Sequence, residues 1–314
     1  ATLRRQRQMC IRDRPYNDED YIVEGDRICI DHHTAHIYSA LSDCSQHAAF
    51  DGWGSGRNTG LTVTPDGQKR YKDLSIGKFL SYVGYAMDFK GMEVDFPGKV
   101  MGLQAYGTPD LDLARQINQD NILDLCGEWM LRGVDSKDSK FQDFVATVHK
   151  ACELIQLEYF KVFDSSKKIS CSGGVMLNTV INTELRKTYD IEIIPHVYDG
   201  GLSVGALRYA VGHNFDMSNF PYCQDDYAPE EAHDDTIEKA AELLAQGKII
   251  GWYQGHGEIG PRALGNRSIL MNPMIKNGKD ILNSRVKKRE WWRPFGASVS
   301  VSYTHLTLPT KSSG

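Results

Sequence analysis

The sequence predicts an α/β protein, because two segments of the chain repeat the order strand, glycine turn, helix. The first is an apolar run at 168–171, followed by Gly173-Gly174 and a helix. The second is a run at 191–197, followed by the turn 199–201 and another helix. A hydrophobic content of 41% over 314 residues is enough to bury a large core.

The other elements follow from the spacing of apolar residues, which recur every three or four positions in helices and cluster in short runs in strands. Residues 214–235 are rich in Asp, Glu, Pro and Tyr without apolar periodicity, which predicts a linker. In chain order, we expect a strand at 27–30, a helix at 32–41, a strand at 61–63, helices at 77–88 and 141–163, a helix from about 177, a helix ending near 211, a helix at 236–246 and a strand at 248–253.

Both ends of the chain look foreign to the protein. RRQRQMCIRD near the start and VSYTHLTLPT near the end show no periodicity, and complementary DNA strands can encode the two peptides. We therefore assign residues 1–14 and 301–314 to adaptor-derived tails and expect an internal fragment of a longer enzyme. Its first unit covers 15–213, and 236–300 begins a second, truncated unit. The tails hold six basic side chains and one acidic one, so without them the formal net charge changes from −5 to −10.

Composition excludes several classes of protein. An acidic body without a basic stripe argues against tight nucleic-acid binding, which depends on neutralising phosphates. The seven cysteines include no CxxC pair, which argues against a zinc ribbon or a compact disulfide framework and favours a reducing cytoplasm. The sequence contains no run of about 18 apolar residues, which is the length that would predict a membrane span.

Three histidines and an aspartate stand together in Asp31-His32-His33-Thr34-Ala35-His36. On a helix, His32 and His36 share a face and can present two imidazoles to one ion, whereas His33 points away by about 100°. The alternative is a set of capping or packing histidines beside the aspartate.

Two aspartates at glycine turns could supply oxygen ligands. Asp51 and Asp199 each follow an apolar run, where a carboxylate can project into a cleft. Two imidazoles with two carboxylates suit Fe(II), Mn(II) or Zn(II) better than an ion that prefers thiolates. As turn formers, the same aspartates need no function.

Two further segments could bind nucleotide phosphates. Gly173-Gly174 lies between a strand and a helix that contains Asn178, where backbone N–H groups can approach phosphate oxygens. Lys99 stands among small residues in GKVMGLQAYG. A simple tight turn and a solvent-facing cation are the alternatives.

The second unit carries a dense basic cluster within GEIGPRALGNRSIL and VKKREWWRPF. Guanidinium groups match phosphate or carboxylate oxygens in pairs, so the cluster predicts a site for a small, highly charged phosphoester. A solvated basic face, or a docking surface for the acidic first unit, is the alternative. Its members are Arg262, Arg267, Ser268, Lys287, Arg289 and Arg293.

Together, the segments DHHTAH, GKVMGLQAYG, SGGVMLN, the DGG turn with Gly205, GEIGPRALGNRSIL and VKKREWWRPF resemble the O-carbamoyltransferases of the NodU/CmcH type. The resemblance spans nearly all of 28–299. It implies an actin/sugar-kinase-like (ribonuclease H-like) domain, incomplete at its N-terminus, followed by the start of a YrdC-like domain. It also implies that carbamoyl phosphate and ATP form carbamoyl-adenylate, whose carbamoyl group passes to an acceptor hydroxyl at a metal site.

Carried over by position, the resemblance assigns a role to each candidate residue. The metal ligands would be His32, His36, Asp51 and Asp199. Nucleotide and phosphate binding would fall to Gly173, Gly174, Asn178, Lys99, Arg289 and Arg293, and catalysis in the YrdC-like half to Arg262, Arg267, Ser268 and Lys287.

The expected partner is a small-molecule or sugar hydroxyl acceptor, with no nucleic acid or membrane, and the resemblance allows a homodimer. The family's N-terminal strands, with a histidine suited to act as base, would lie upstream of residue 15, and most of the YrdC-like domain beyond Val299. Two other hypotheses remain open: a tRNA threonylcarbamoyl-transfer enzyme with the same fold and metal site, and an inactive fragment that binds only metal and nucleotide.

Overall fold

The computed structural model describes residues 19–25, 27–72, 75–212, 216, 218–224, 233–296 and 298. The two expected adaptor-derived tails and much of the expected linker lie outside the described residues. Among the described helices, none is both long enough and apolar enough to cross a membrane.

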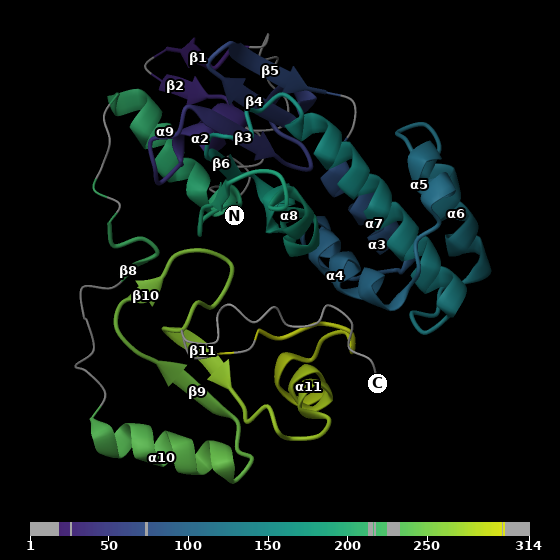
Figure 1. The fold of residues 1–314 in the computed structure, drawn as a ribbon, viewed down its shortest axis with the longest axis vertical. Coiled ribbons are helices and arrows are strands. Elements are labelled where there is room, and N and C mark those ends of the chain that lie inside the picture. Colours follow the sequence, from purple (N-terminus) through teal and green to yellow (C-terminus); the bar gives the residue numbers. More distant parts are fainter. Residues whose placement is uncertain are drawn as a thin grey trace.

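A five-stranded mixed sheet forms the centre of the first unit (Figure 1), with strand order β5-β4-β3-β6-β7. Strands β3, β4 and β5 are antiparallel neighbours, whereas β6 runs parallel to both β3 and β7. Parallel pairs need helical crossovers, so the arrangement confirms the expected α/β class. The bounds are β3 Gln46–Phe50, β4 Gly60–Thr64, β5 Gly67–Tyr71, β6 Ile169–Ser172 and β7 Ile191–Ile193.

The sheet is covered by helices on both faces because its side chains alternate along each strand. On β3, Ala48 and Phe50 join the main core, whereas Ala49 packs with Ile37 on the other face. Figure 1 shows α2 and α9 beside one another, and α3 and α7 together on the opposite side. The bounds are α2 His32–Tyr38, α3 Ile76–Ala86, α4 Phe96–Leu103, α5 Leu111–Gln116, α6 Ile122–Arg132, α7 Ser139–Phe160, α8 Thr179–Leu185 and α9 Leu202–Val211.

Helices α2 and α9 cross at unusually close range. A Cβ atom on Gly205 would overlap the carbonyl oxygen of Ala35, so only glycine lets the two backbones touch. A hairpin of β1 (Tyr21–Glu24) and β2 (Arg27–Ile30) leads into α2. The start of α2 is therefore fixed by the hairpin and its middle by α9.

The second half of the chain forms two small antiparallel sheets, β8 with β10 and β9 with β11. Strand β8 was not expected, because it falls inside the predicted linker, and it forms by pairing with β10. The bounds are β8 Tyr222–Gln224, α10 Asp234–Ala245, β9 Ile250–Tyr253, β10 Gly257–Glu258, β11 Arg267–Leu270, α11 Gly278–Ile281 and a π-helical segment at Leu282–Lys287.

The last described segment packs against the first unit. Trp292 is buried in the main hydrophobic core, where its ring stacks on Phe89, and its Nε1 donates to the carbonyl of Lys99 at 2.8 Å. Trp291 Nε1 donates to Ser136 Oγ at 3.2 Å. The basic stretch that we expected in the second unit is thus anchored on the first.

Candidate metal centre and anion site

The two histidines predicted to share a helix face lie on α2, and both are buried. Asp31 caps this helix, since its Oδ1 accepts a hydrogen bond from the Thr34 amide at 2.9 Å. Arg70, on β5, donates to the same oxygen at 2.8 Å. The cap therefore fixes where the helix begins, and with it the direction of His32 and His36.

Two turns bring carboxylates to these imidazoles. Asp51 directly follows β3, and its Oδ2 lies 3.3 Å from Nε2 of both His32 and His36. Asp199 lies at the turn before α9, and its Oδ1 is 3.8 and 3.9 Å from the same two nitrogens. One ligand atom from each residue falls within 4.8 Å of the other three, so the structure brings together all four residues expected to bind the metal.

The electrostatics of the cluster favour a cation at its centre. Burial lowers the pKa of His36, but the carboxylates of Asp199 and Asp51 outweigh it and raise the pKa to about 9. Burial raises the pKa of Asp51, and His32 and His36 hold it well below its usual range instead. The buried Nε2 of His36 has no hydrogen-bond partner among the described residues. Two imidazoles and two carboxylates converge around it, and this set of donors fits a divalent metal ion.

His33 differs from its neighbours. It is fully buried, and burial together with the neighbouring His32 lowers its pKa to about 3. Its ring lies against Gly54, where a Cβ atom would come within 2.6 Å of His33 Nδ1. His33 is therefore a neutral packing residue outside the four-residue cluster.

The predicted glycine turn lies beside Asp51. Gly173 has φ of 89°, and a Cβ atom there would overlap the Phe50 carbonyl, so the position requires glycine. The Gly174 amide donates to Asp51 Oδ2 at 3.2 Å. Asn178 caps α8 and hydrogen bonds to the buried His149, with its Nδ2 2.9 Å from His149 Nε2.

A second cluster of charge lies where the end of the described chain meets the first unit. Burial and the charge of Arg293 lower the pKa of Arg262. Burial, Arg293 and Arg262 likewise lower the pKa of Arg289. Glu290 is 3.0 Å from Lys99 and 3.5 Å from Arg293. One carboxylate therefore stands among four cations, an arrangement that attracts an anion.

The remaining predicted residues have different surroundings. Arg267 donates through Nε to the buried Glu258 at 3.2 Å and through its terminal nitrogen to the Gly260 carbonyl at 2.5 Å. Ser268 lies on β11 opposite Trp252, and Lys287 is exposed at the end of the π-helical segment.

Sequence reasoning assigned no role to three residues that shape these sites: Arg70, Glu258 and Glu290. Glu258 accepts from the amides of Leu264 and Asn266 at 2.9 and 2.7 Å and so folds the loop that carries Arg262. Glu258 could be recognised in the sequence as a charged residue among turn formers. Its hydrogen-bond partners could not be predicted, because they depend on how the loop folds back.

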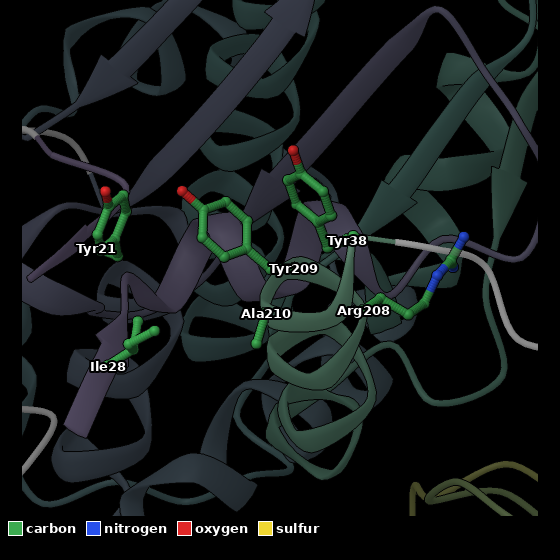
Figure 2. A pocket seen from close by; sticks show the side chains of 7 residues that line it. Tyr21, Ile28, Tyr38, Arg208, Tyr209 and Ala210 are labelled. Atoms are coloured by element: carbon green, nitrogen blue, oxygen red, sulfur yellow. The ribbon is translucent and has the colours of Figure 1, made fainter. Parts of the chain in front are cut away.

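A separate pocket of about 620 Å³ lies on the other side of α2. Figure 2 shows the rings of Tyr21, Tyr209 and Tyr38 in a row, with Ile28 and Ala210 nearby. Tyr38 follows His36 by two positions, which on a helix places its side chain about 200° away. The pocket is therefore distinct from the metal cluster.

Comparison with known proteins identifies the family. The family model "Carbamoyltransferase N-terminus" matches residues 18–207, and "Carbamoyltransferase C-terminus" matches 241–313. Nodulation protein NolNO of Sinorhizobium fredii is 32% identical over 88% of this chain and 48% of its own length. The 3'-hydroxymethylcephem-O-carbamoyltransferase of Streptomyces clavuligerus is 29% identical over 63% of this chain and 43% of its own length.

Among solved structures, component A of the (R)-2-hydroxyglutaryl-CoA dehydratase of Acidaminococcus fermentans aligns over 56% of this chain and 66% of its own length, with a TM-score of 0.40 and 14% identity. The chain spans about half the length of the curated relatives that it matches. The matches to both family models confirm the resemblance carried by the sequence motifs: the chain belongs to the carbamoyltransferase family of the NodU/CmcH type.

Proposed function

We propose that this chain is part of an O-carbamoyltransferase that holds a divalent metal, Fe(II) in preference to Mn(II) or Zn(II). The enzyme would use carbamoyl phosphate and ATP to form carbamoyl-adenylate and transfer its carbamoyl group to a hydroxyl of a small molecule. The observation that carries the proposal is the convergence of His32, His36, Asp51 and Asp199. Family membership supports the reaction class, and the name of the cephem O-carbamoyltransferase supports a hydroxyl acceptor.

Transfer requires activation of both reactants. A metal held by the four residues would supply Lewis acidity to an oxygen of the acceptor or of the phosphoester. The acceptor oxygen forms a bond to the carbamoyl carbon, the bond from that carbon to the phosphate oxygen breaks, and AMP leaves with the electron pair. The hydroxyl proton passes to a base. Such a step needs no covalent enzyme intermediate.

The arginine cluster supplies the matching anion site. Arg262, Arg289 and Arg293 lie close enough to repel one another, and Glu290 offsets only part of their charge. A phosphate group would relieve this repulsion through paired guanidinium contacts. We therefore assign carbamoyl phosphate or the adenylate phosphate to these three arginines. Lys99 is engaged with Glu290, so its role would be to fix the segment that presents them.

The threonylcarbamoyl-transfer alternative requires a tRNA acceptor. The expected acidic body, with a net charge of −10 without its tails, disfavours so highly charged a partner. The second half of the chain also places three arginines close together, and such a compact cluster fits a small phosphoester better than a nucleic acid.

Metal analysis tests the proposal directly. We expect the purified chain to bind about one equivalent of Fe(II), Mn(II) or Zn(II) per molecule, measured by elemental analysis and titration calorimetry. Replacing one residue that contacts the metal, as in His36→Ala, should lower the metal affinity at least about 100-fold. Removing a residue that only hydrogen bonds to a metal ligand already lowers the affinity about 10- to 100-fold. His233→Ala, at an exposed histidine on the second half, is the matched control and should bind as the wild type does.

ATP–pyrophosphate exchange with carbamoyl phosphate separates the enzymatic proposal from the fragment hypothesis. Exchange that depends on Arg262 supports the enzyme. Metal binding without exchange would support a fragment that binds metal and nucleotide only. An unchanged metal content in the His32→Ala, His36→Ala double variant would refute the assigned metal centre.

A further inference from the structure

The segment 195–201, which leads into α9, contains a buried histidine in addition to Asp199. His196 stands three positions before Asp199, and its side chain is fully buried. Its Nε2 lies 2.9 Å from the backbone carbonyl of Ser39, the residue that caps the C-terminal end of α2. A carbonyl only accepts hydrogen bonds, so Nε2 carries the proton and donates. This bond ties the segment directly to the end of the helix that carries the two candidate histidine ligands.

The end of α2 is in turn bonded to the backbone of His36. Ser39 Oγ donates to the His36 carbonyl at 2.7 Å, and Ser172 Oγ, at the end of β6, donates to the same carbonyl at 2.8 Å. His196 therefore bonds to the residue that holds one candidate ligand and lies in the segment that carries another. The Nε2 atom of His36 and the Oδ1 atom of Asp199 are 3.9 Å apart, and this separation depends on how the segment is fixed to the helix.

Close contacts leave the segment little freedom to move. A Cβ atom on Gly201 would lie 2.3 Å from the His196 carbonyl oxygen and 2.6 Å from Cδ2 of its ring, so only glycine fits beside the histidine. The Gly173 amide donates to the Val197 carbonyl at 2.7 Å. The segment is thus tied to α2 through His196 and to β6 through Val197 before it presents Asp199.

The second half of the chain covers the same histidine. The ring of Phe220 packs edge-on against the His196 imidazole, with the two ring centroids 4.9 Å apart. A Cβ atom on Gly260 would lie 2.5 Å from the Pro195 carbonyl oxygen, so the loop that carries Arg262 lies directly against the segment. His196 is therefore enclosed between α2 and the second half, where its hydrogen bond is shielded from water.

We propose that His196 is a positioning residue of the metal centre. Its hydrogen bond to the end of α2 holds the Asp199 carboxylate at the distance from His32 and His36 that a shared metal ion requires. His196 is not itself one of the four clustered residues, and its Nε2 is already bonded to a carbonyl. Residues that hydrogen bond around a metal site in this way orient its ligands. The role rests on the proposed metal centre.

Titration calorimetry with Zn(II) and a competing chelator tests the role on the full chain. His196→Leu keeps an apolar side chain but removes the donor, so we expect the Zn(II) affinity to fall about 10- to 100-fold. His196→Gln can place an amide donor near the position of Nε2 and should recover most of the affinity. Phe141→Leu, in the core contact between α7 and Trp129 of α6, is the control: it destabilises the protein elsewhere and should leave the Zn(II) affinity unchanged.

A double-mutant cycle with Asp199→Asn separates positioning from a general structural effect. If His196 acts through the Asp199 carboxylate, His196→Leu should lower the Zn(II) affinity far less in the Asp199→Asn background than in the wild type. An equal fall in both backgrounds would refute the role. Should His196→Leu fail to fold, as judged by circular dichroism, the same cycle is run with Phe220→Ala, which removes the ring that covers His196. Phe220→Ala should then lower the affinity only while Asp199 is present, and an unchanged affinity would count against the role.

A second measurement needs no metal. Long-range ¹H–¹⁵N NMR spectra of the metal-free protein should show His196 protonated at Nε2 and not at Nδ1, because Nε2 faces the Ser39 carbonyl. The opposite tautomer would show that the hydrogen bond is absent and would overturn the proposal. Wild-type Zn(II) affinity in His196→Leu would refute the positioning role alone, whereas a wild-type chain that binds no metal would refute the metal centre and this role with it.

Discussion

His36 and His149 are both buried, yet their surroundings shift their pKa values in opposite directions. The carboxylates of Asp199 and Asp51 overcome the effect of burial and raise the pKa of His36 to about 9. Burial lowers the pKa of His149 to about 4, because its hydrogen bond to Asn178 supplies no charge to offset it. Two carboxylates beside His36 therefore favour positive charge at that position, whereas the neutral Asn178 beside His149 does not.

The neutral state of His149 makes a prediction about pH. Its pKa is about 6.5 in the unfolded chain and about 4 in the folded protein, so the unfolded state gains a proton first as the pH falls. The free energy of unfolding should therefore decrease between about pH 6.5 and pH 4, by up to about 3 kcal/mol from this residue. Denaturant unfolding of wild type and His149→Gln at pH 7, 5.5 and 4 measures it. Parallel pH profiles for the two proteins would contradict the assignment.

At the residue scale, local rules could predict the metal cluster but not the charge partners. The four-residue spacing of His32 and His36 and the position of Asp51 after a strand are visible in the sequence. The pairing of Lys99 with Glu290 joins segments from opposite halves of the chain, and no local pattern encodes it. The roles of the four clustered residues as metal ligands, and of the arginines as phosphate ligands, stay predictions that the binding experiments test.

At the scale of elements, α2 has only seven residues and would not be stable in isolation. It depends on Asp31, which is fully buried and paired with the nearly buried Arg70. Burial raises the pKa of Asp31, but Arg70 and the Thr34 amide lower it further than burial raises it. The cap thus stays ionised inside the protein and keeps α2, the helix of the candidate ligands His32 and His36, in place.

Removing Arg70 should therefore be costly. Arg70→Ala leaves the Asp31 carboxylate buried without its cation, and we expect the free energy of unfolding to fall by about 3–5 kcal/mol. The exposed pair of Arg132 and Glu128 provides the control, since Arg132→Ala should cost no more than about 0.5 kcal/mol. Urea unfolding measures both. Equal losses in the two variants would show that the buried pair does not stabilise the helix.

The two strand–turn–helix units and the long helix α7 followed from the sequence, whereas the short helices α4, α5 and α6 did not, and neither did the ends of the elements. The run at 191–197 forms ladder pairs only as far as Ile193, because its partner β6 ends and turns at Gly173. Residues 195–198 form a turn instead, and the Gly173 amide donates to the Val197 carbonyl at 2.7 Å, which ties this turn to the end of β6. Helix α2 ends at Tyr38 instead of 41, since Ser39 already caps it. Such limits depend on neighbours that periodicity does not reveal.

At the scale of the whole molecule, one tryptophan joins the two halves of the chain. Trp292 belongs to the core of the first unit, and its neighbours Arg289 and Arg293 belong to the anion cluster. Gly102 leaves room for the indole, because a Cβ atom there would lie 3.1 Å from it. The position of the arginines is therefore set by hydrophobic packing on α4.

Trp292→Ala should both destabilise the protein and disperse the arginines. Truncating a buried tryptophan costs about 3–5 kcal/mol, which thermal or urea unfolding would detect. Trp53→Ala, at an exposed tryptophan, should cost far less. Affinity for inorganic phosphate, measured by calorimetry under folding conditions, should fall in Trp292→Ala and stay unchanged in Trp53→Ala. Wild-type stability in Trp292→Ala would mean that the segment is not part of the core.

Gly205 lies in the first turn of α9 against the backbone of Ala35, and it is not one of the four metal-binding candidates. Adding even one methyl group there would wedge α9 away from α2 and carry Asp199 off with it. The proposed metal site would therefore depend on Gly205, which contributes no side chain to it. We expect relatives that keep this pair of helices to keep glycine at the position of Gly205, because any side chain there would meet the Ala35 carbonyl.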